Sequence, residues 1–354
     1  MKIAFFGSSL VSAYWNGAAT YYRGLVKELH RLGHDVTFYE PDAFGRQAHR
    51  DIADPDWAEV VVYEPTEADA LAMVARASAA DVVVKASGVG VLDDVLEEAI
   101  AEAPGLSVLW DVDAPATLAR LTEDPDDPLR ALVPRFDLVL TYGGGEPVVR
   151  RYCAIGAREC VPVYNALDPE THHPVPPDLR FTADLAFVGN RLPDREARVE
   201  EFFLRPALLL PGRSFLLAGS GWEDKPLPEN VRLLGHVSTN DHNALNCTPH
   251  AVLNVLRDTM ADNGWSPATR VFEAAGAAAC LISDEWLGME DFLDPGREVL
   301  VAACAEDVVE ALDTLTPAAR RAIGDAARRR VLAEHTYAHR AEQVEQLLAR
   351  VLVS

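Results

Sequence analysis

Short runs of apolar residues alternate with helix-like segments along most of the chain, and this alternation constrains the fold more than any other feature. Runs that are apolar at almost every position are typical of parallel sheets covered by helices on both faces. The first 165 residues therefore predict a doubly wound α/β domain. Its expected strands lie at 3–7, 36–40, 59–65, 81–88, 106–113 and 136–145.

A second alternating series follows a break in this pattern. Residues 166–183 carry several prolines and show no periodicity, as expected of a linker. Apolar runs return at 184, and we assign 184–335 to a second Rossmann-like α/β domain, followed by a helical tail at 336–354. The default ligand position in such a tandem is the cleft between the two domains.

The chain is strongly acidic, with 32 Lys and Arg against 55 Asp and Glu and a net charge of −23 at pH 7. Such a surface repels nucleic acid and anionic membranes, so neither is expected as a partner. An anionic ligand must meet a local positive site, which makes single arginines in loops informative. No apolar run is long enough for a signal-peptide core or a membrane span, and we expect a cytoplasmic protein.

Several common motifs are absent from the sequence. There is no G-x-G-x-x-G after the first apolar run and no G-x-x-x-x-G-K-[ST], so a nicotinamide dehydrogenase and a P-loop ATPase are disfavoured. Five scattered cysteines without a C-x-x-C pair indicate neither a disulfide framework nor a thiolate zinc site. His172 and His173 lack the spacing of metal ligands; we interpret them as surface residues of the linker and predict no metal site.

One stretch, SPATRVFEAAG at 266–276, has the features of an anion site. Ser266 followed by Pro267 predicts a helix that begins at about residue 267, with Ser266 as its cap. Free N–H groups at this helix start attract phosphate, and Thr269 and Arg270 in the first turn add further donors.

Arg270 and Glu273 lie three residues apart on one face of this helix, and two interpretations are open. An exposed ion pair at this spacing contributes about 0.2–0.5 kcal/mol. However, every residue from 274 to 282 is apolar or glycine, which indicates a buried helix, where a charge needs a partner or a ligand. In the functional interpretation Arg270 meets a phosphate and Glu273 accepts hydrogen bonds from a sugar hydroxyl.

Polar residues also follow other predicted strands. Asn16 and Gly17 precede a helix of the first domain and are candidates for a phosphate or sugar contact. Asp111 and Asp113 are candidates for a general base, a ligand of a substrate hydroxyl or a helix cap, with a structural or binding role favoured. Arg195 lies near a helix start of the second domain, either as a diphosphate clamp or as a solvated surface residue.

Several segments carry a resemblance to a known family. The most specific is LNVLRDTMADNGWSPATRVFEAAGAAACLISDEWLGMEDFLDPGREVLV, and further support comes from NGAATYYRGLVKELHRLGHDVTFYE, WDVDAPATLARL, FDLVLTYGGG and DLAFVGNRLPDRE. Together they resemble the spore maturation protein B-like glycosyltransferases, a branch of the GT-B superfamily of nucleotide-sugar-dependent enzymes. The resemblance spans most of the chain and implies two Rossmann-like domains, with the C-terminal helix packed back on the first.

The resemblance also implies where the substrates bind. The acceptor, which is an unknown small molecule, glycan or protein, is held mainly by the first domain. The nucleotide-diphosphate sugar is a co-substrate held mainly by the second domain, and no other cofactor and no metal is needed. Glu273 falls where a glutamate contacts the donor ribose, and Arg270 and Ser266 fall beside the diphosphate. Arg195 matches an arginine after the first strand of the donor domain, and Arg257 lies in the N-x-x-R of a later strand.

One position departs from the family pattern. Many retaining GT-B enzymes carry a second glutamate eight residues before the ribose one, and here that position is Trp265. Retention or inversion at the anomeric carbon therefore stays open. The predicted function is metal-independent glycosyl transfer, and the alternatives are a nucleotide-sugar epimerase on the same fold and a non-catalytic regulatory protein that binds a nucleotide sugar. Richness in alanine and arginine is consistent with a bacterial source of high GC content.

Overall fold

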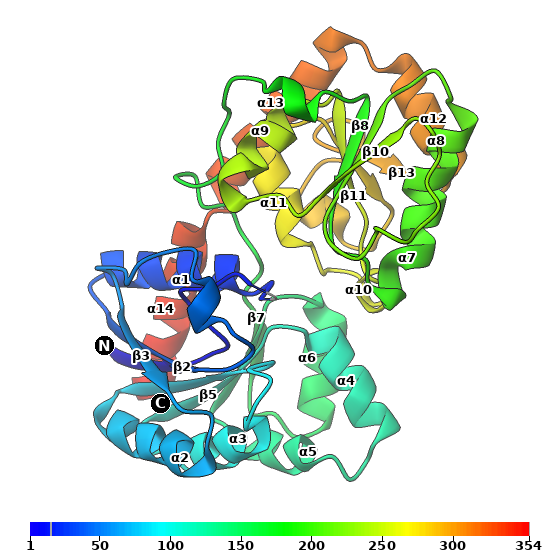
Figure 1. The fold of residues 1–354 in the computed structure, drawn as a ribbon. Helices are drawn as coiled ribbons and strands as arrows, with labels where there is room; N and C mark the ends of the chain where they lie inside the picture. Colours follow the sequence, from blue (N-terminus) through cyan, green and yellow to red (C-terminus); the bar gives the residue numbers. More distant parts are fainter. Residues whose placement is uncertain (15, 354) are drawn as a thin grey trace. The chain divides into compact units, whose positions relative to one another are not determined.

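The structure is a computed structural model that describes residues 1–14 and 16–353 of the 354-residue chain. The chain divides into two compact units (Figure 1). The first unit comprises Met1–Asn165 and Tyr337–Ser354, and the second comprises Ala166–Thr336. Residues 166–183, predicted to be a linker, belong to the second unit and include a 3₁₀ helix at Leu179–Phe181.

The first unit is built on a seven-stranded parallel sheet in the order β3-β2-β1-β4-β5-β6-β7. The strand order reverses between β1 and β4, which makes this point the topological switch point of the sheet. The strands are β1 (Lys2–Phe6), β2 (Asp35–Pro41), β3 (Glu59–Tyr63), β4 (Val82–Ala86), β5 (Leu106–Asp111), β6 (Leu138–Thr141) and β7 (Cys160–Pro162).

Helices cover both faces of this sheet, as the apolar strands require. They are α1 (Ala19–Arg31), α2 (Glu67–Arg76), α3 (Asp93–Ala101), α4 (Ala114–Glu123), α5 (Pro128–Leu132), α6 (Gly145–Ala154) and the predicted C-terminal helix α14 (Tyr337–Val353). Helix α14 packs directly on α1, and the contact depends on a glycine. A Cβ atom at Gly24 would lie 2.1 Å from the ring of Tyr337.

The second unit repeats the doubly wound pattern on a six-stranded parallel sheet in the order β10-β9-β8-β11-β12-β13. The order reverses between β8 and β11, so this sheet also has a switch point at its carboxyl edge. The strands are β8 (Leu185–Val188), β9 (Phe215–Ala218), β10 (Val231–Gly235), β11 (Ala251–Asn254), β12 (Leu281–Asp284) and β13 (Leu300–Ala302).

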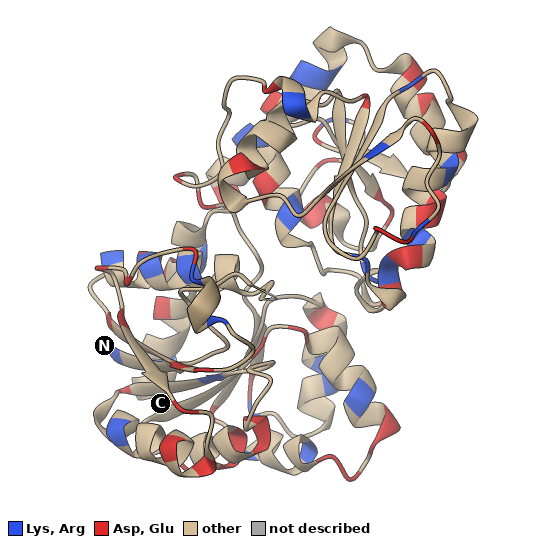
Figure 2. Cartoon of the chain, viewed as in Figure 1, with Lys and Arg blue, Asp and Glu red and all other residues tan. Residues whose placement is uncertain are grey.

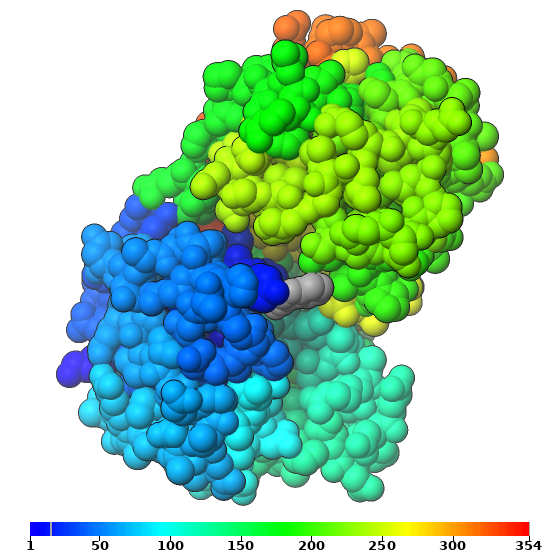
Figure 3. All heavy atoms as spheres, viewed as in Figure 1, coloured from blue at the N-terminus to red at the C-terminus, as the bar shows by residue number. Residues whose placement is uncertain are grey.

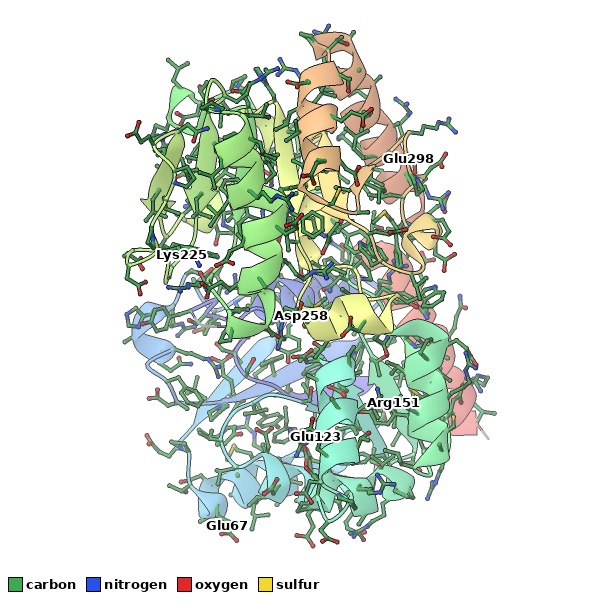
Figure 4. All side chains as sticks on the ribbon, turned by 90° about the vertical axis from the view of Figure 1, so that its right-hand side faces the viewer. Glu67, Glu123, Arg151, Lys225, Asp258 and Glu298 are labelled. Carbon is green, nitrogen blue, oxygen red and sulfur yellow. The ribbon has the colours of Figure 1, made fainter. Side chains whose placement is uncertain are left out.

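The helices of the second unit complete its two outer layers (Figure 1). In chain order they are α7 (Pro193–Val199), α8 (Arg205–Leu209), α9 (His242–Cys247), α10 (Asp258–Asn263), α11 (Thr269–Gly276), α12 (Ala305–Thr314) and α13 (Pro317–Glu334), with a π-helical turn at Glu200–Leu204 between α7 and α8. Figure 4 marks the start of α10 by Asp258.

Charged residues of both signs are distributed over both units (Figure 2), so the excess of acid is spread rather than gathered at one place. Within the described part of the chain, no helix combines the length and the apolar character needed to cross a membrane. The predicted fold class, two Rossmann-like sheets in tandem with a helical tail, is therefore present in the structure.

Candidate functional site

Helix α11 begins later than the sequence predicts. Its first residue is Thr269 and its N-cap is Ala268, so the expectation that Ser266 caps the helix is wrong. The Ser266 hydroxyl is buried and donates to the Gly264 carbonyl at 2.9 Å, which removes it from the helix start. Ala268 has no side-chain acceptor, and α11 therefore starts without a side-chain cap. The N–H group of Val271 in the first turn donates to the Ala268 carbonyl at 3.0 Å, and the positive end of the helix dipole makes such a start favourable for an anion.

Three arginines that the sequence singled out approach one another at the carboxyl edge of the second sheet. Arg257 follows β11, Arg195 lies on α7 after β8, and Arg270 lies on α11. Burial lowers the pKa of Arg195 to about 10, and the positive charges of Arg270 and Arg257 contribute to the decrease. Two neighbouring positive charges that lower the pKa of a third indicate a position that favours an anion.

The three guanidinium groups differ in the contacts they make. Arg257 donates from Nε to Asp194 at 2.6 Å. Arg195 lies over the ring of Phe187, 5.6 Å from its centroid, and its buried Nε has no hydrogen-bond partner among the described residues. Arg270 is half-buried and makes no hydrogen bond or ion pair with any residue that the structure describes. The cluster therefore carries more positive charge than its surroundings neutralise.

Room for Arg195 depends on the glycine that follows β8. A Cβ atom at Gly189 would lie 2.8 Å from Arg195 Nη2, so a larger residue would displace the guanidinium. The Arg195 Nη2 atom donates to the Asn190 carbonyl. The turn after β8 thus holds Arg195 along the edge of the sheet. This turn does not contain the P-loop motif G-x-x-x-x-G-K-[ST].

Glu273 is buried, with 8% of its surface exposed, and it does not form the i,i+3 ion pair with Arg270 that one of the two interpretations allowed. On a different segment, His172 Nε2 lies 3.7 Å from Glu273 Oε1. Burial alone would raise the pKa of Glu273, but His172, His242 and Arg270 outweigh burial, and the pKa lies below its ordinary value. Glu273 is therefore a buried carboxyl group whose ionised form is favoured, and in that form both of its oxygens act only as hydrogen-bond acceptors.

His172 is buried rather than exposed on a linker, which corrects the interpretation made from the sequence. The segment that carries it packs against α9, where Asn243 donates to the Thr171 carbonyl at 2.8 Å. His173 is half-buried in the same segment. Burial lowers the pKa of His242, although the charge of Glu273 opposes the decrease. No sequence pattern connects either histidine with Glu273, because the contact arises only from the packing of three separate segments.

The same three residues are the one described group that has the composition and spacing of a metal site. The ligand atoms of His172, His242 and Glu273 all lie within 4.8 Å of one another. Thr171 contacts the other ring nitrogen of His172 at 3.1 Å, which fixes the orientation of that ring. Two imidazoles and one carboxylate are typical ligands of zinc, so the absence of a metal remains a prediction rather than a finding.

Trp265 occupies the position where many retaining enzymes have a glutamate, and its side chain is held by its surroundings. Its indole Nε1 donates to Asp291 at 2.8 Å. The ring lies against Gly288, where a Cβ atom would approach Trp265 Nε1 to 2.2 Å. The backbone of Trp265 has a φ of 44°, in the left-handed region that bulky residues rarely adopt. This segment therefore replaces a charged group by a fixed aromatic side chain.

In the first unit, Asp111 ends β5 and is fully engaged in hydrogen bonds. Its carboxylate accepts from Ser87 at 2.8 Å, from the Asp113 amide at 3.0 Å, from Thr117 at 3.0 Å and from Tyr152 at 2.5 Å. Asp113 is half-buried at the N-cap position of α4, but its side chain does not cap that helix. The hydrogen bonds of Asp111 connect it with neighbouring elements of the first unit, which agrees with the structural or binding role that the sequence analysis favoured over a general base.

Asn16 is also engaged within its own loop. Its Nδ2 donates to the carbonyls of Ser9 and Ser12 at 2.8 and 3.0 Å, and its Oδ1 accepts from Ser8 at 2.9 Å. Gly17 is exposed, with open space around the position of a Cβ atom. The predicted contact of these residues with a substrate therefore depends on the backbone near Gly17 rather than on the Asn16 amide.

Comparison with solved structures identifies the architecture. Sucrose-phosphate synthase from Thermosynechococcus elongatus superposes with a TM-score of 0.76 at 14% identity, over 100% of this chain and 99% of that one. HepE of Anabaena, in complex with UDP and glucose, superposes with a TM-score of 0.71 at 15% identity, over 99% of this chain and 100% of that one. A DNA-modifying β-glucosyltransferase superposes with a TM-score of 0.64 at 14% identity, over 99% of both chains. The chain has the GT-B fold.

A family model matches part of this GT-B chain. Residues 195–346 match the family described as glycosyl transferase-like, a segment that contains Arg195, Arg257, Arg270 and Glu273. No curated protein sequence matches the chain. The family match and the GT-B fold together support the prediction that the protein is a glycosyltransferase.

Proposed function

We propose that this GT-B protein transfers a sugar from a nucleotide-diphosphate donor, bound by the second unit, to an acceptor bound by the first. The observation that carries the proposal is the group of three arginines at the uncapped start of α11, with Arg270 left without a partner among the described residues. HepE and the DNA-modifying β-glucosyltransferase were studied with UDP-glucose, so UDP-glucose is the first donor to test. We propose further that this protein is related to the spore maturation protein B-like glycosyltransferases.

The proposed role of the arginines is to neutralise the leaving diphosphate. Transfer breaks the bond between the anomeric carbon and the diphosphate oxygen, and negative charge develops on that oxygen in the transition state. Arg195, Arg257 and Arg270 are preorganised donors, and the N–H groups at the start of α11 add to them with the positive end of the helix dipole. Guanidinium groups supply this charge without a metal ion, so we propose metal-independent transfer with the nucleotide sugar as co-substrate and no other cofactor.

Glu273 is proposed to bind the ribose of the nucleotide. A carboxylate accepts one hydrogen bond on each oxygen, which matches a pair of adjacent sugar hydroxyls. The two neighbouring histidines keep Glu273 ionised in spite of its burial. Thr269, the first residue of α11, is proposed to line the diphosphate end of the same site, and the backbone near Ser266, three residues earlier, is proposed to be part of it.

For the acceptor, Asp113 is the more suitable candidate base of the two aspartates. Asp111 already accepts four hydrogen bonds, and a proton taken up there would break that network. Transfer with inversion needs a base within hydrogen-bond reach of the acceptor hydroxyl, and Asp113 follows β5 by two residues, at the N-cap position of α4. The predicted backbone contact near Gly17 is part of the same acceptor region of the first unit.

The proposal is tested first by nucleotide binding. UDP, GDP, ADP, CDP and dTDP are compared by thermal shift with the wild-type protein, Arg270→Gln, and the control Arg191→Gln. Arg191 is paired with Glu196 at 2.7 Å and Asp224 at 2.9 Å, so its loss removes an arginine that is already neutralised. We expect one nucleotide to stabilise the wild type and the control selectively, because a ligand that binds only the folded state raises its stability. Equal stabilisation of Arg270→Gln would refute the arginine assignment.

A second assay separates transfer from the two alternatives. The nucleotide that binds is supplied as its glucose conjugate, and both free nucleotide and sugar products are measured with and without an acceptor mixture. Acceptor-dependent release of nucleotide and a new glycoside supports the transferase. An epimerised sugar without any acceptor would indicate the epimerase, and binding without consumption would indicate a regulatory protein.

A further inference from the structure

The switch point of the first sheet contains a buried arginine that no role described so far explains. Arg46 follows β2 and has only 6% of its surface exposed. Its Nη1 donates to the carbonyl of Ser8, after β1, at 3.2 Å and to the carbonyl of Val89, after β4, at 3.3 Å. Arg46 therefore lies between the two loops that leave the sheet where its strand order reverses, which is the usual ligand position of an open α/β sheet.

The charge of Arg46 is not balanced by a direct partner. Among the described residues, no carboxylate lies within ion-pair distance of its guanidinium, and its Nε has no hydrogen-bond partner. Nη1 is used by the two carbonyls, so the edge formed by Nε and Nη2 is the one left for a ligand. That edge is the one that binds a carboxylate or a phosphate through two parallel hydrogen bonds. A buried cation without such a partner is costly, which points to an anionic ligand.

The acidic side chains around this position have other partners. Glu40 accepts from Ser9 at 2.9 Å, from the Leu10 amide at 2.6 Å and from Gln47 at 2.5 Å. Asp93 pairs with the buried Lys85 at 2.7 Å. Glu40 thus binds the neighbouring loops and Asp93 neutralises a second buried cation. Neither carboxylate forms an ion pair with Arg46.

A second unpartnered polar group lies beside Arg46. Tyr22 on α1 is fully buried, and its hydroxyl makes no hydrogen bond with a described residue. Ser8 is the polar side chain next to it. The Ser8 hydroxyl donates to Asn16 at 2.9 Å, and its polar interaction with the phenol partly opposes the rise that burial causes in the pKa of Tyr22. The Ser8 carbonyl accepts from Arg46 Nη1 at 3.2 Å, so the same residue contacts Arg46 and neighbours Tyr22. Arg46 Nε and the Tyr22 hydroxyl are thus two buried donors at one switch point, and both are groups that can bind an oxyanion.

An exposed aromatic residue packs on the Arg46 guanidinium. The ring of Phe44 lies 5.0 Å from the Arg46 guanidinium, and 55% of Phe44 is exposed. Its segment lies on the surface of the first unit, in the blue region of Figure 3. The backbone of Phe44 has a φ of 56°, and Gly90 gives its ring room, since a Cβ atom there would lie 2.9 Å from Phe44 Cε2. Phe44 is thus the exposed residue that packs on the Arg46 guanidinium.

We propose that Arg46 and the Tyr22 hydroxyl bind the oxyanion of an acceptor that carries a carboxylate or a phosphate group. The assignment of this anion to the acceptor rests on the proposed glycosyl transfer, whereas the anion site itself does not. On this proposal, the first unit takes anionic acceptors such as sugar phosphates or sugar acids.

The binding test uses the full chain saturated with UDP, so that the arginines of the second unit are occupied. Inorganic phosphate, glucose 6-phosphate, glucuronate and neutral glucose are titrated against wild type, Arg46→Gln, Tyr22→Phe and Arg50→Gln. Arg50 is exposed in the same segment and pairs with Asp54, which makes its variant the matched control. We expect saturable binding of glucose 6-phosphate or glucuronate, but not of glucose, and the preferred one of the two identifies a phosphate or a carboxylate ligand.

Loss of the guanidinium is expected to weaken the anion by about tenfold or more, because a charge-assisted bidentate contact is removed. Tyr22→Phe weakens it less, Arg50→Gln leaves it unchanged, and all variants bind UDP like the wild type. Equal anion affinity of Arg46→Gln and wild type, or no saturable anion binding by wild type, overturns the inference. Should Arg46→Gln fail to fold, unchanged anion binding by Tyr22→Phe overturns it.

Transfer from UDP-glucose distinguishes this inference from the proposed function. Turnover on neutral acceptors alone, at equal rates in wild type and Arg46→Gln, overturns the inference and leaves the glycosyltransferase intact. Anion binding that depends on Arg46, without consumption of any sugar nucleotide, supports the site and overturns the proposed function.

Discussion

Replacement of Glu273 by glutamine tests the donor site most directly. The carboxylate is 8% exposed and ionised, so each hydrogen bond it accepts from the ribose is charge-assisted and shielded from water. Hydrogen bonds to charged groups contribute about 1.5–3 kcal/mol each. Glutamine keeps one acceptor and loses the charge, so the binding free energy of UDP is expected to fall by about 1.5–3 kcal/mol, or roughly 10- to 150-fold in Kd.

Calorimetric titration of UDP and of its 2′,3′-dideoxy analogue against wild type and Glu273→Gln isolates the ribose contact. Wild type is expected to bind the analogue more weakly than UDP, whereas the variant should bind the two alike, which gives a coupling energy between carboxylate and hydroxyls. Glu310→Gln, an exposed change on α12 of the same unit, serves as the control and should bind like wild type. Equal losses for UDP and the analogue in the variant would refute the contact.

Three further predictions concern stability and metal. Burial raises the pKa of Glu97 on α3 to about 7, and Lys85 opposes the increase. The stability that this raised pKa contributes is complete below the unfolded-state pKa of about 4.3 and is lost as the pH rises through 7. The free energy of unfolding in urea should therefore fall by at most about 1.4 kcal/mol per pH unit over this range, and Glu97→Gln should abolish the fall. A pH profile unchanged in that variant would contradict the assignment. Gly24→Ala brings a Cβ to 2.1 Å from the Tyr337 ring and should cost about 1–3 kcal/mol of unfolding free energy, whereas Gly212→Ala, in open space, should change it little; equal effects would place α14 elsewhere. Treatment with a chelator should leave UDP binding and turnover unchanged, because arginines neutralise the diphosphate, and a loss that zinc restores would instead put a metal at the group around Glu273.

The periodicity of the sequence was sufficient to predict the fold class. The run DVVVKASG at 81–88 predicted a strand buried on both faces, and all five residues of β4 are buried. The alternation of such runs with helices leaves few arrangements other than parallel sheets with covering helices. The start of α11 was less predictable. Ser266-Pro267 has the composition of a helix start, but the helix begins at Thr269, and the Ser266 hydroxyl donates to the Gly264 carbonyl.

The sequence by itself also determined which side chains of α11 were candidates for binding, since one arginine and one glutamate stand out among small and apolar residues. Only the tertiary structure decided their partners. The sequence allowed Arg270 and Glu273 to neutralise each other, whereas in the structure Glu273 faces His172 and His242 and Arg270 joins the other arginines. Local spacing fixes which residues share a helical face. The partner of a buried charge is set by segments distant in sequence, because packing determines which polar atoms reach it.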